Sequence, residues 1–102
     1  MEKRRPHYEL KAIQSQMSSV ETLVLTVSAR HGIKRAGLSL SEAWLVIHNL
    51  KGANFYKSMT VHADHRVWQD VYHAQHRGRG LYLKFQQLGE YFVVSFKERD
   101  DE

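Results

Sequence analysis

The sequence contains no cysteine. This absence excludes a disulfide framework and a thiolate zinc site, and it fits a reducing compartment, so we expect a cytoplasmic protein. No apolar run approaches the roughly 18 residues of a membrane-spanning helix, and the charged N-terminus does not resemble a signal peptide. A chain of 102 residues has the length of one domain, and we predict a single domain over residues 1–102.

Two common catalytic motifs are also missing. No serine lies in the strand–turn–helix elbow of a Ser-His-Asp hydrolase. The glycines of Arg77–Gly80 are expected to open a strand and not a helix, so they do not form a phosphate-binding loop. Neither of these two chemistries is predicted for the chain.

The seven histidines do not form a clear metal site. Four of them lie near one another in the sequence, namely His62, His65, His73 and His76. The last two have a possible ligand spacing, but we place them in a basic turn over residues 73–80, where positions three apart need not converge. Only Asp64 or Asp70 could add a carboxylate to the set. We therefore expect neither a metal nor another cofactor.

The charge of the chain indicates a class of partner. Lysine and arginine outnumber aspartate and glutamate by 15 to 11, which gives a net charge of +4 and an isoelectric point near 9.5. A small basic domain fits a nucleic-acid partner. On charge alone, a domain that is basic without binding nucleic acid fits equally well.

Period-two alternation dominates the segment from Phe55 to Lys97. The alternating apolar positions are Leu81, Leu83 and Phe85 in one run, and Phe92, Val94 and Phe96 in the next. Such alternation is typical of antiparallel strands with one buried and one exposed face. Paired as a hairpin, the two runs place four polar side chains on the exposed face: Tyr82, Lys84, Ser95 and Lys97.

Helical periodicity precedes this segment. We predict helices over Tyr8–Met17, from about Ser28 to Ala36, and from Ser39 to just before Gly52, where Ser39 and Glu42 have capping-box spacing. Residues 22–27 fit a helix or a strand, and their β-branched content favours a strand. Residues 1–7 are expected to form an exposed basic arm. Helices followed by strands predict an α+β domain with the helices on one face of the sheet.

Basic, amide and aromatic side chains are interleaved along the strands: Tyr56, Lys57, Gln69, Tyr72, Tyr82, Lys84 and Lys97. They are compatible with a solvated sheet face, and equally with RNA cleavage by attack of the ribose 2′-hydroxyl on the neighbouring phosphorus. That reaction needs positioned groups, positive charge at the phosphate and proton donors, which lysine, tyrosine and amide side chains can supply. Aromatic faces can stack unpaired bases.

Several blocks of the chain resemble the motility quorum-sensing regulator family of toxins. The blocks are Phe55–Thr60, Asp64–His65, Trp68–Tyr72, Tyr82–Lys84 and Val94–Glu98, together with residues 1–4 and 6–7. They keep the family's order and spacing over the whole length, and the match is strongest from Phe55 onward. The resemblance implies an α+β fold related to the RelE group of toxins, with N-terminal helices packed on one face of a twisted, mainly antiparallel sheet.

The resemblance also implies an activity. Toxins of this family belong to type II toxin–antitoxin systems and are mRNA interferases, that is, endoribonucleases that cut single-stranded mRNA at GC-containing triplets without a metal or the ribosome. The expected product ends in a 2′,3′-cyclic phosphate. The expected protein partner is a cognate antitoxin with a zinc-binding domain and a helix-turn-helix domain.

The family's functional lysine, glutamine and tyrosine match Lys57, Gln69 and Tyr82. Further matches around that site, together with the interleaved side chains above, predict substrate contacts for His7, Tyr56, Met59, Tyr72, Lys84 and Lys97. The family usually has an arginine where this chain has His73, so we expect Arg77 or Arg79 to replace that contact. The alternative from another class is a binding module that docks RNA or an acidic partner on the same face without cleaving it.

Overall fold

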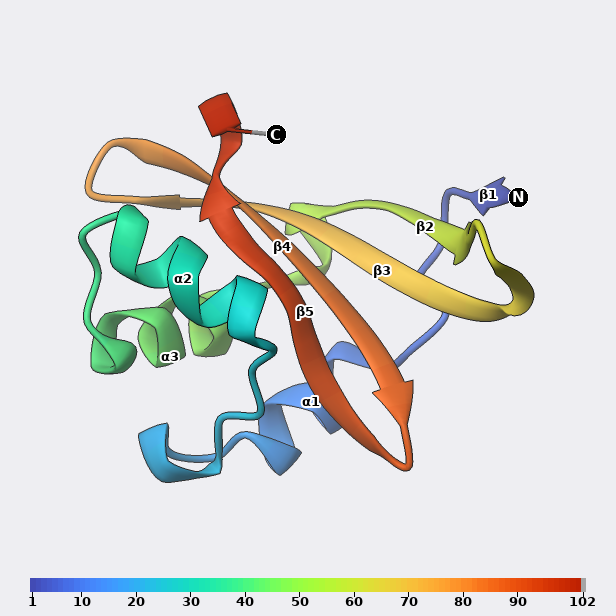
Figure 1. The fold of residues 1–102 in the computed structure, drawn as a ribbon, viewed down its shortest axis with the longest axis horizontal. Helices are drawn as coiled ribbons and strands as arrows, with labels where there is room; N and C mark the ends of the chain where they lie inside the picture. Colours follow the sequence, from blue (N-terminus) through green and yellow to red (C-terminus); the bar gives the residue numbers. More distant parts are fainter. Residues whose placement is uncertain (102) are drawn as a thin grey trace.

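The computed structural model describes residues 1–101 of the chain. Its sheet has five strands in sequence order: β1 (Glu2–Lys3), β2 (Phe55–Val61), β3 (Asp64–His76), β4 (Arg79–Leu88) and β5 (Glu90–Glu98). All neighbouring strands are antiparallel. Figure 1 shows the three helices gathered on one side of this twisted sheet. The predicted α+β class is therefore confirmed.

The three helices are α1 (Leu10–Gln16), α2 (Val27–Arg35) and α3 (Leu40–Asn49). Each lies within about two residues of its predicted range. The capping box at the start of α3 is present, because the Ser39 hydroxyl accepts from the Glu42 backbone N–H and the Glu42 carboxylate accepts from that of Ser39. Short 3₁₀ turns occupy Val20–Thr22, Gly52–Asn54 and Arg99–Asp101.

One predicted feature of the N-terminal half is wrong, and another is incomplete. Residues 22–27 do not form a strand, since only Leu25 makes a single parallel bridge, to Val93 of β5. Residues 1–7 are mostly exposed, as predicted, but they also form part of the sheet, because Glu2 and Lys3 pair with Met59 and Ser58 at its edge. In both places the pairing partner is distant in the sequence, and local patterns do not reveal it.

Gly32 explains why α2 lies directly against β5. A Cβ built at Gly32 would stand 1.8 Å from the carbonyl oxygen of Phe96, so only glycine permits this approach of helix to strand. Glycine inside a helix normally lowers its stability relative to alanine. In this protein the glycine lets α2 pack against β5, the edge strand of the sheet, whose backbone groups would otherwise be exposed and unpaired.

The alternation predicted for β5 is shifted by a bulge. Lys84 pairs with Ser95 and Phe85 pairs with Val93, so Val94 is an additional residue in the ladder. As a result Val93 and Phe96 are fully buried, whereas Phe92 and Val94 are only partly so. Residues 24–26 form hydrogen bonds with β5 at the bulge. In one of them, the Thr26 hydroxyl donates to the Val94 carbonyl at 2.7 Å.

The hydrophobic core lies between the helices and one face of the sheet. It is formed by apolar side chains of all three helices together with side chains of β3, β4 and β5, including Tyr72, Leu81, Leu83, Phe85 and Phe96. The β3–β4 hairpin turns at Arg77 and Gly78, which both have positive φ, as a two-residue type I′ hairpin turn requires. The predicted turn over residues 73–80 is therefore shorter than expected, and His73 and His76 lie in β3.

Candidate nucleic-acid interface

The sheet face opposite the helices, which we call the outer face, collects most of the predicted site. Residues that pair across antiparallel strands share a face, so the register assigns each side chain. Lys57 pairs with Val71, Val71 with Lys84, and Lys84 with Ser95, which makes one row across four strands. The flanking rows contain Met59 and Gln69 on one side, and His73, Tyr82 and Lys97 on the other.

The outer face is more covered than a solvated sheet face would be. Val71 has no exposed surface although it is not part of the helix-side core. Its neighbours in the row are the two lysines, whose aliphatic stems can cover apolar surface while the ammonium groups stay in contact with solvent. The row therefore presents two ammonium groups to solvent beside the buried apolar side chain of Val71.

Lys57 is held by the N-terminal strand. Its ammonium nitrogen lies 2.9 Å from a carboxylate oxygen of Glu2. The hydrogen bond with Glu2 raises the pKa of Lys57, and its charge interactions with Glu2, Tyr56 and Tyr82 act in the same direction. Lys57 consequently remains protonated at neutral pH and is suited to neutralising an anion, not to accepting a proton.

Lys84 has the opposite environment. Its half-buried position, together with the nearby charge of Lys97, lowers the pKa of its ammonium group. Of the two lysines in the central row, Lys84 gives up a proton more easily. The outer face thus presents one lysine fixed in its charged form and one shifted toward the neutral form.

Aromatic rings border this pair of lysines. The ring of His73 stacks on Tyr56, with centroids 4.2 Å apart and planes inclined by 17°, and lies 6.0 Å from the ring of Tyr82. The ammonium nitrogen of Lys97 lies 5.2 Å from the centre of the Tyr82 ring, within cation–π range. Tyr56 is 44% exposed, so a ring surface is available to stack a base.

Gln69 is positioned by a residue that the sequence analysis did not single out. Its amide nitrogen donates to the side-chain oxygen of Gln86 at 2.7 Å. This bond fixes which end of the Gln69 amide is the donor toward β4. Continuing the alternation of Tyr82 and Lys84 by two residues would have placed Gln86 on the same face.

Tyr72 does not belong to the outer face, so the structure does not group it with Lys57, Gln69 and Tyr82. Its side chain has no exposed surface and packs edge-on against Phe55 and Phe85 in the core. Burial, with a smaller effect from the charge of Asp70, raises the pKa of Tyr72 to about 12. Both Val71 and Tyr72 are fully buried, which is why alternation alone could not assign their faces.

His7 also lies away from the predicted cluster. Its ring stacks on Trp68 at 5.3 Å, and Nδ1 is 3.0 Å from the Lys3 ammonium nitrogen. The backbone N–H groups of His7 and Tyr8 donate to the carboxylate of the fully buried Asp70 at 2.9–3.1 Å. Asp70 pairs with Ser58 and Phe85 and projects to the helix side of β3, so the backbone of His7 is held on that side, and its substrate contact stays a prediction.

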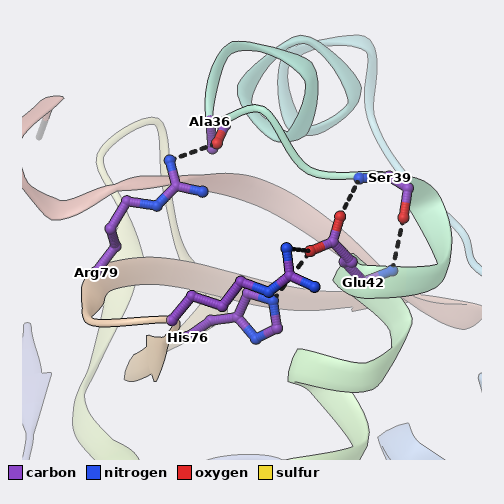
Figure 2. A network of polar contacts seen from close by, with 6 residues as sticks. Ala36, Ser39, Glu42, His76 and Arg79 are labelled. Atoms are coloured by element: carbon purple, nitrogen blue, oxygen red, sulfur yellow. Dashed lines mark hydrogen bonds and ion pairs between the residues drawn. The ribbon is translucent and has the colours of Figure 1, made fainter.

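The two arginines of the β3–β4 hairpin are directed toward the helices and not to the outer face. Arg79 donates to the Ala36 carbonyl at 2.6 Å and pairs with Glu98 at 3.1 Å, and Figure 2 shows its side chain reaching the end of α2. Arg77 pairs with Glu42 at 3.2 Å. In this structure neither arginine lies on the outer face with His73, and the expectation that one of them replaces the family contact there stays a prediction.

Glu42 is the centre of that separate network. Besides the ion pair with Arg77, a Glu42 carboxylate oxygen lies 3.2 Å from Nε2 of His76. The same carboxylate accepts a hydrogen bond from the Ser39 backbone N–H at the start of α3, and Figure 2 shows both contacts. These contacts attach the hairpin to the helical layer. Within residues 1–101, no group of three or more histidine or acidic side chains is arranged to hold a metal ion. Nor is any helix of that part of the chain long and apolar enough to cross a membrane.

Comparison with known proteins identifies the family. The family described as "Motility quorum-sensing regulator, toxin of MqsA" matches residues 5–98. The mRNA interferase toxin MqsR of Escherichia coli (strain K12) is 36% identical over 99 residues, an alignment that covers 97% of this chain and 100% of that protein. The match extends over nearly the whole chain and includes every strand from β2 to β5. The chain belongs to the motility quorum-sensing regulator family of toxins.

Proposed function

We propose that the outer face is the active site of an endoribonuclease toxin that cleaves single-stranded mRNA. The observation that carries this proposal is the convergence of Lys57, Gln69 and Tyr82, which come from three strands, on one face beside Lys84 and Lys97. The name of the Escherichia coli relative, an mRNA interferase toxin, supports the same activity. A sheet face that only needed to be soluble would not require this arrangement.

The proposed reaction is transesterification within the RNA. The ribose 2′-oxygen attacks the adjacent phosphorus, the bond from phosphorus to the 5′-oxygen breaks, and the products are a 2′,3′-cyclic phosphate and a 5′-hydroxyl. The 2′-hydroxyl must lose a proton and the leaving 5′-oxygen must gain one. Extra negative charge develops on the non-bridging oxygens in between, and stabilising it is a large contribution to catalysis.

The cations divide these tasks according to their environments. Lys57, protonated at neutral pH, and Lys97 bind the non-bridging oxygens in our proposal. Tyr82 lies beside both and delivers or orients a proton at the leaving oxygen. Lys84, whose pKa is lowered, is the lysine best suited to take the proton from the 2′-hydroxyl.

Amide and ring groups position the substrate. The bond between Gln69 and Gln86 orients the Gln69 carbonyl oxygen away from β4, where it can accept from a ribose hydroxyl or a base. We propose that Tyr56, stacked on His73, extends a surface for one unpaired base and that Met59 packs beside it. Correct placement of the 2′-oxygen is itself a major part of the rate enhancement.

We also propose the finer properties that the resemblance implies. These are cutting at GC-containing triplets, independence of metal and of the ribosome, a cytoplasmic location, and neutralisation by a cognate antitoxin with zinc-binding and helix-turn-helix domains. The family description contains the words "toxin of MqsA", and this pairing of a toxin with a second protein supports an antitoxin partner. The basic charge of the chain suits an RNA substrate.

The deciding experiment is incubation of the purified protein with a long unstructured RNA in the presence of EDTA. Discrete fragments ending in 2′,3′-cyclic phosphate are expected, and mapping their ends gives the sequence preference. Lys57→Ala should lose the fragments and should also relieve growth arrest in bacteria that express the protein alone. A mobility shift without any fragments would favour the non-cleaving binding module. Cleavage that is lost in EDTA and restored by a metal would contradict metal independence.

A further inference from the structure

A polar groove lies between α2 and β5, immediately beside the outer face. It has a volume of about 460 Å³ and is lined by residues that include Ser28, His31 and Arg35 of the helix and Ser95 and Lys97 of the strand. None of its lining residues is acidic. A hollow this polar and cationic is suited to an anion and not to an apolar ligand.

The close approach of α2 to β5 creates the groove. Gly32 lies against the Phe96 carbonyl, and a Cβ at Gly32 would also be 3.5 Å from the Cβ of Lys97. One face of α2, at positions 28, 31 and 35, therefore stands along the edge of β5. Ala29 and Ile33, on the other side of the helix, are buried in the core.

The donors that line the groove are not used inside the protein. Within residues 1–101, the guanidinium of Arg35 and the hydroxyls of Ser28 and Ser95 have no hydrogen-bond or ion-pair partner. Lys97 makes no ion pair with a described residue and contacts the Tyr82 ring. The sequence of α2 holds three cations and a histidine but no acid, so the helix does not neutralise the groove.

Two residues connect the groove with the outer face. Ser95 pairs with Lys84 and Lys97 pairs with Tyr82, so both belong to the proposed active site and also line the groove. A strand of RNA that leaves the outer face across β5 reaches the groove next. The Ser95 hydroxyl and the Lys97 ammonium group are thus common to the two places.

We propose that this groove binds the phosphodiester backbone of the RNA next to the cleaved linkage, with Arg35 as its principal cationic contact. The proposal rests on the proposed function, since the ligand is the same RNA that the outer face cleaves. Arg35 offers a planar set of donors that matches phosphate oxygens, and Ser28, His31 and Ser95 add further polar groups. The groove would extend the RNA-binding surface beyond the reacting nucleotides.

The test compares Arg35→Ala with Lys34→Ala. Lys34 is the adjacent residue, is exposed, and carries the same charge, but does not line the groove. The ligand is an RNA containing one mapped cleavage site, blocked by a 2′-deoxy nucleotide at the attacking position, and its dissociation constant is measured over a range of salt concentrations. Arg35→Ala should weaken binding and reduce the slope of log K against log salt by about 0.7, the value for one phosphate contact on a single strand. Lys34→Ala should leave the slope unchanged.

Two further arms make the result specific. Arg35→Lys, which keeps the charge, should retain the slope. A minimal RNA that contains only the nucleotides flanking the cut should bind wild type and Arg35→Ala equally, because it does not reach the groove. Equal slopes for Arg35→Ala and Lys34→Ala on the long RNA would overturn the proposal. Failure of wild type to cleave the unblocked RNA would instead overturn the proposed function, and the salt slopes on that intact RNA would still test the groove.

Discussion

The carboxylate of Glu2 lies 2.9 Å from the ammonium nitrogen of Lys57, so the edge strand β1 places a negative charge on the lysine that we propose binds the scissile phosphate. The pair is made possible by the two-residue strand, whose Glu2 is paired with Met59 on the outer face. An anionic substrate must compete with this carboxylate for Lys57. Glu2 therefore tunes the site, a role that the sequence analysis did not predict for it.

Glu2→Gln should strengthen RNA binding. Removing the competing carboxylate should lower KM or the dissociation constant about two- to fivefold, since exposed ion pairs are weak. Binding to a blocked RNA at low salt measures this, with the exposed Glu21→Gln as the control for net charge. The pKa of Glu2 is lowered mainly by its hydrogen bond to Lys57, so the carboxylate stays charged until the pH falls below its usual range. The advantage of the variant should disappear only there, and weaker binding at neutral pH would contradict this role.

Tyr82→Phe should separate chemistry from stability. The phenol stands on the outer face beside Lys97, so losing its hydroxyl should reduce the free energy of unfolding by about 1 kcal/mol or less. Cleavage should fall on the order of 100-fold if the hydroxyl assists proton transfer. Thermal melts and RNA-cleavage time courses measure the two effects.

Leu83→Ala is the matched control for Tyr82→Phe. Leu83 is adjacent to Tyr82, points to the opposite face and is fully buried. Its truncation should cost about 2–5 kcal/mol of stability through the cavity that it leaves. At a temperature where the protein is folded, cleavage should persist. Full cleavage by Tyr82→Phe would remove the tyrosine from the mechanism.

The three helices and most side chains of the outer face could be predicted from the sequence. Particular residues show why the remaining features could not. Alternation placed Tyr82, Lys84, Ser95 and Lys97 correctly because one side of their hairpin is continuously buried. It could not anticipate the extra residue at Val94, because a bulge is stabilised by contacts with a distant segment, here residues 24–26.

Two predicted site residues with rings, Tyr72 and His7, lie away from the outer face, and the sequence could not show this for two different reasons. Tyr72 lies where both faces of β3 are covered, so its burial could not be inferred from its neighbours. His7 is located by its backbone, which donates to Asp70, 63 residues away, and no local pattern encodes such a contact. In both cases the information is tertiary.

Asp70→Ala should detach the N-terminal segment. The buried carboxylate accepts from the backbone N–H groups of His7 and Tyr8 and from the Ser58 hydroxyl at 2.6 Å. Bonds to a charged group contribute about 1.5–3 kcal/mol each, so the loss should be roughly 3 kcal/mol or more. Ser58→Ala, which removes one donor, should cost less. Denaturant unfolding measures both, and faster hydrogen exchange at the His7 and Tyr8 amides would report the detachment directly. If Asp70→Ala were as stable as the wild-type protein, Asp70 would not hold the N-terminal segment in this way.

Gly32→Ala should destabilise the protein even though alanine favours helices. The added Cβ meets a backbone carbonyl at 1.8 Å, and backbone cannot rotate away as a side chain can. Overpacking of this kind costs typically about 1–3 kcal/mol, and we expect the upper part of that range. Gly52→Ala is the control, because nothing lies within 4 Å of its Cβ position, and its effect should be within about 0.5 kcal/mol. A stable Gly32→Ala protein would mean that α2 does not lie against β5 as described.

Lys84→Met should lose activity without losing stability. The half-buried ammonium group and the nearby charge of Lys97 lower the pKa of Lys84, which means that folding disfavours its charged form. Between this lowered pKa and the usual 10.5, the unfolded chain binds more protons than the folded one, so wild-type stability should rise with pH in that interval. Methionine keeps the apolar stem and removes the charge, so the variant should melt at or above the wild-type temperature and lose this pH dependence.

The same substitution tests the proposed proton acceptor. Cleavage by wild type should increase as the pH rises toward the lowered pKa of Lys84, because the neutral amine is the form that accepts the proton from the 2′-hydroxyl. Lys84→Met should cut the rate on the order of 100-fold and flatten this limb of the pH–rate profile. Lys84→Arg, which retains a charge but cannot lose its proton in this pH range, should be equally slow. An active arginine variant would show that position 84 supplies only charge, and Lys57 and Lys97 would then have to share the site with another base.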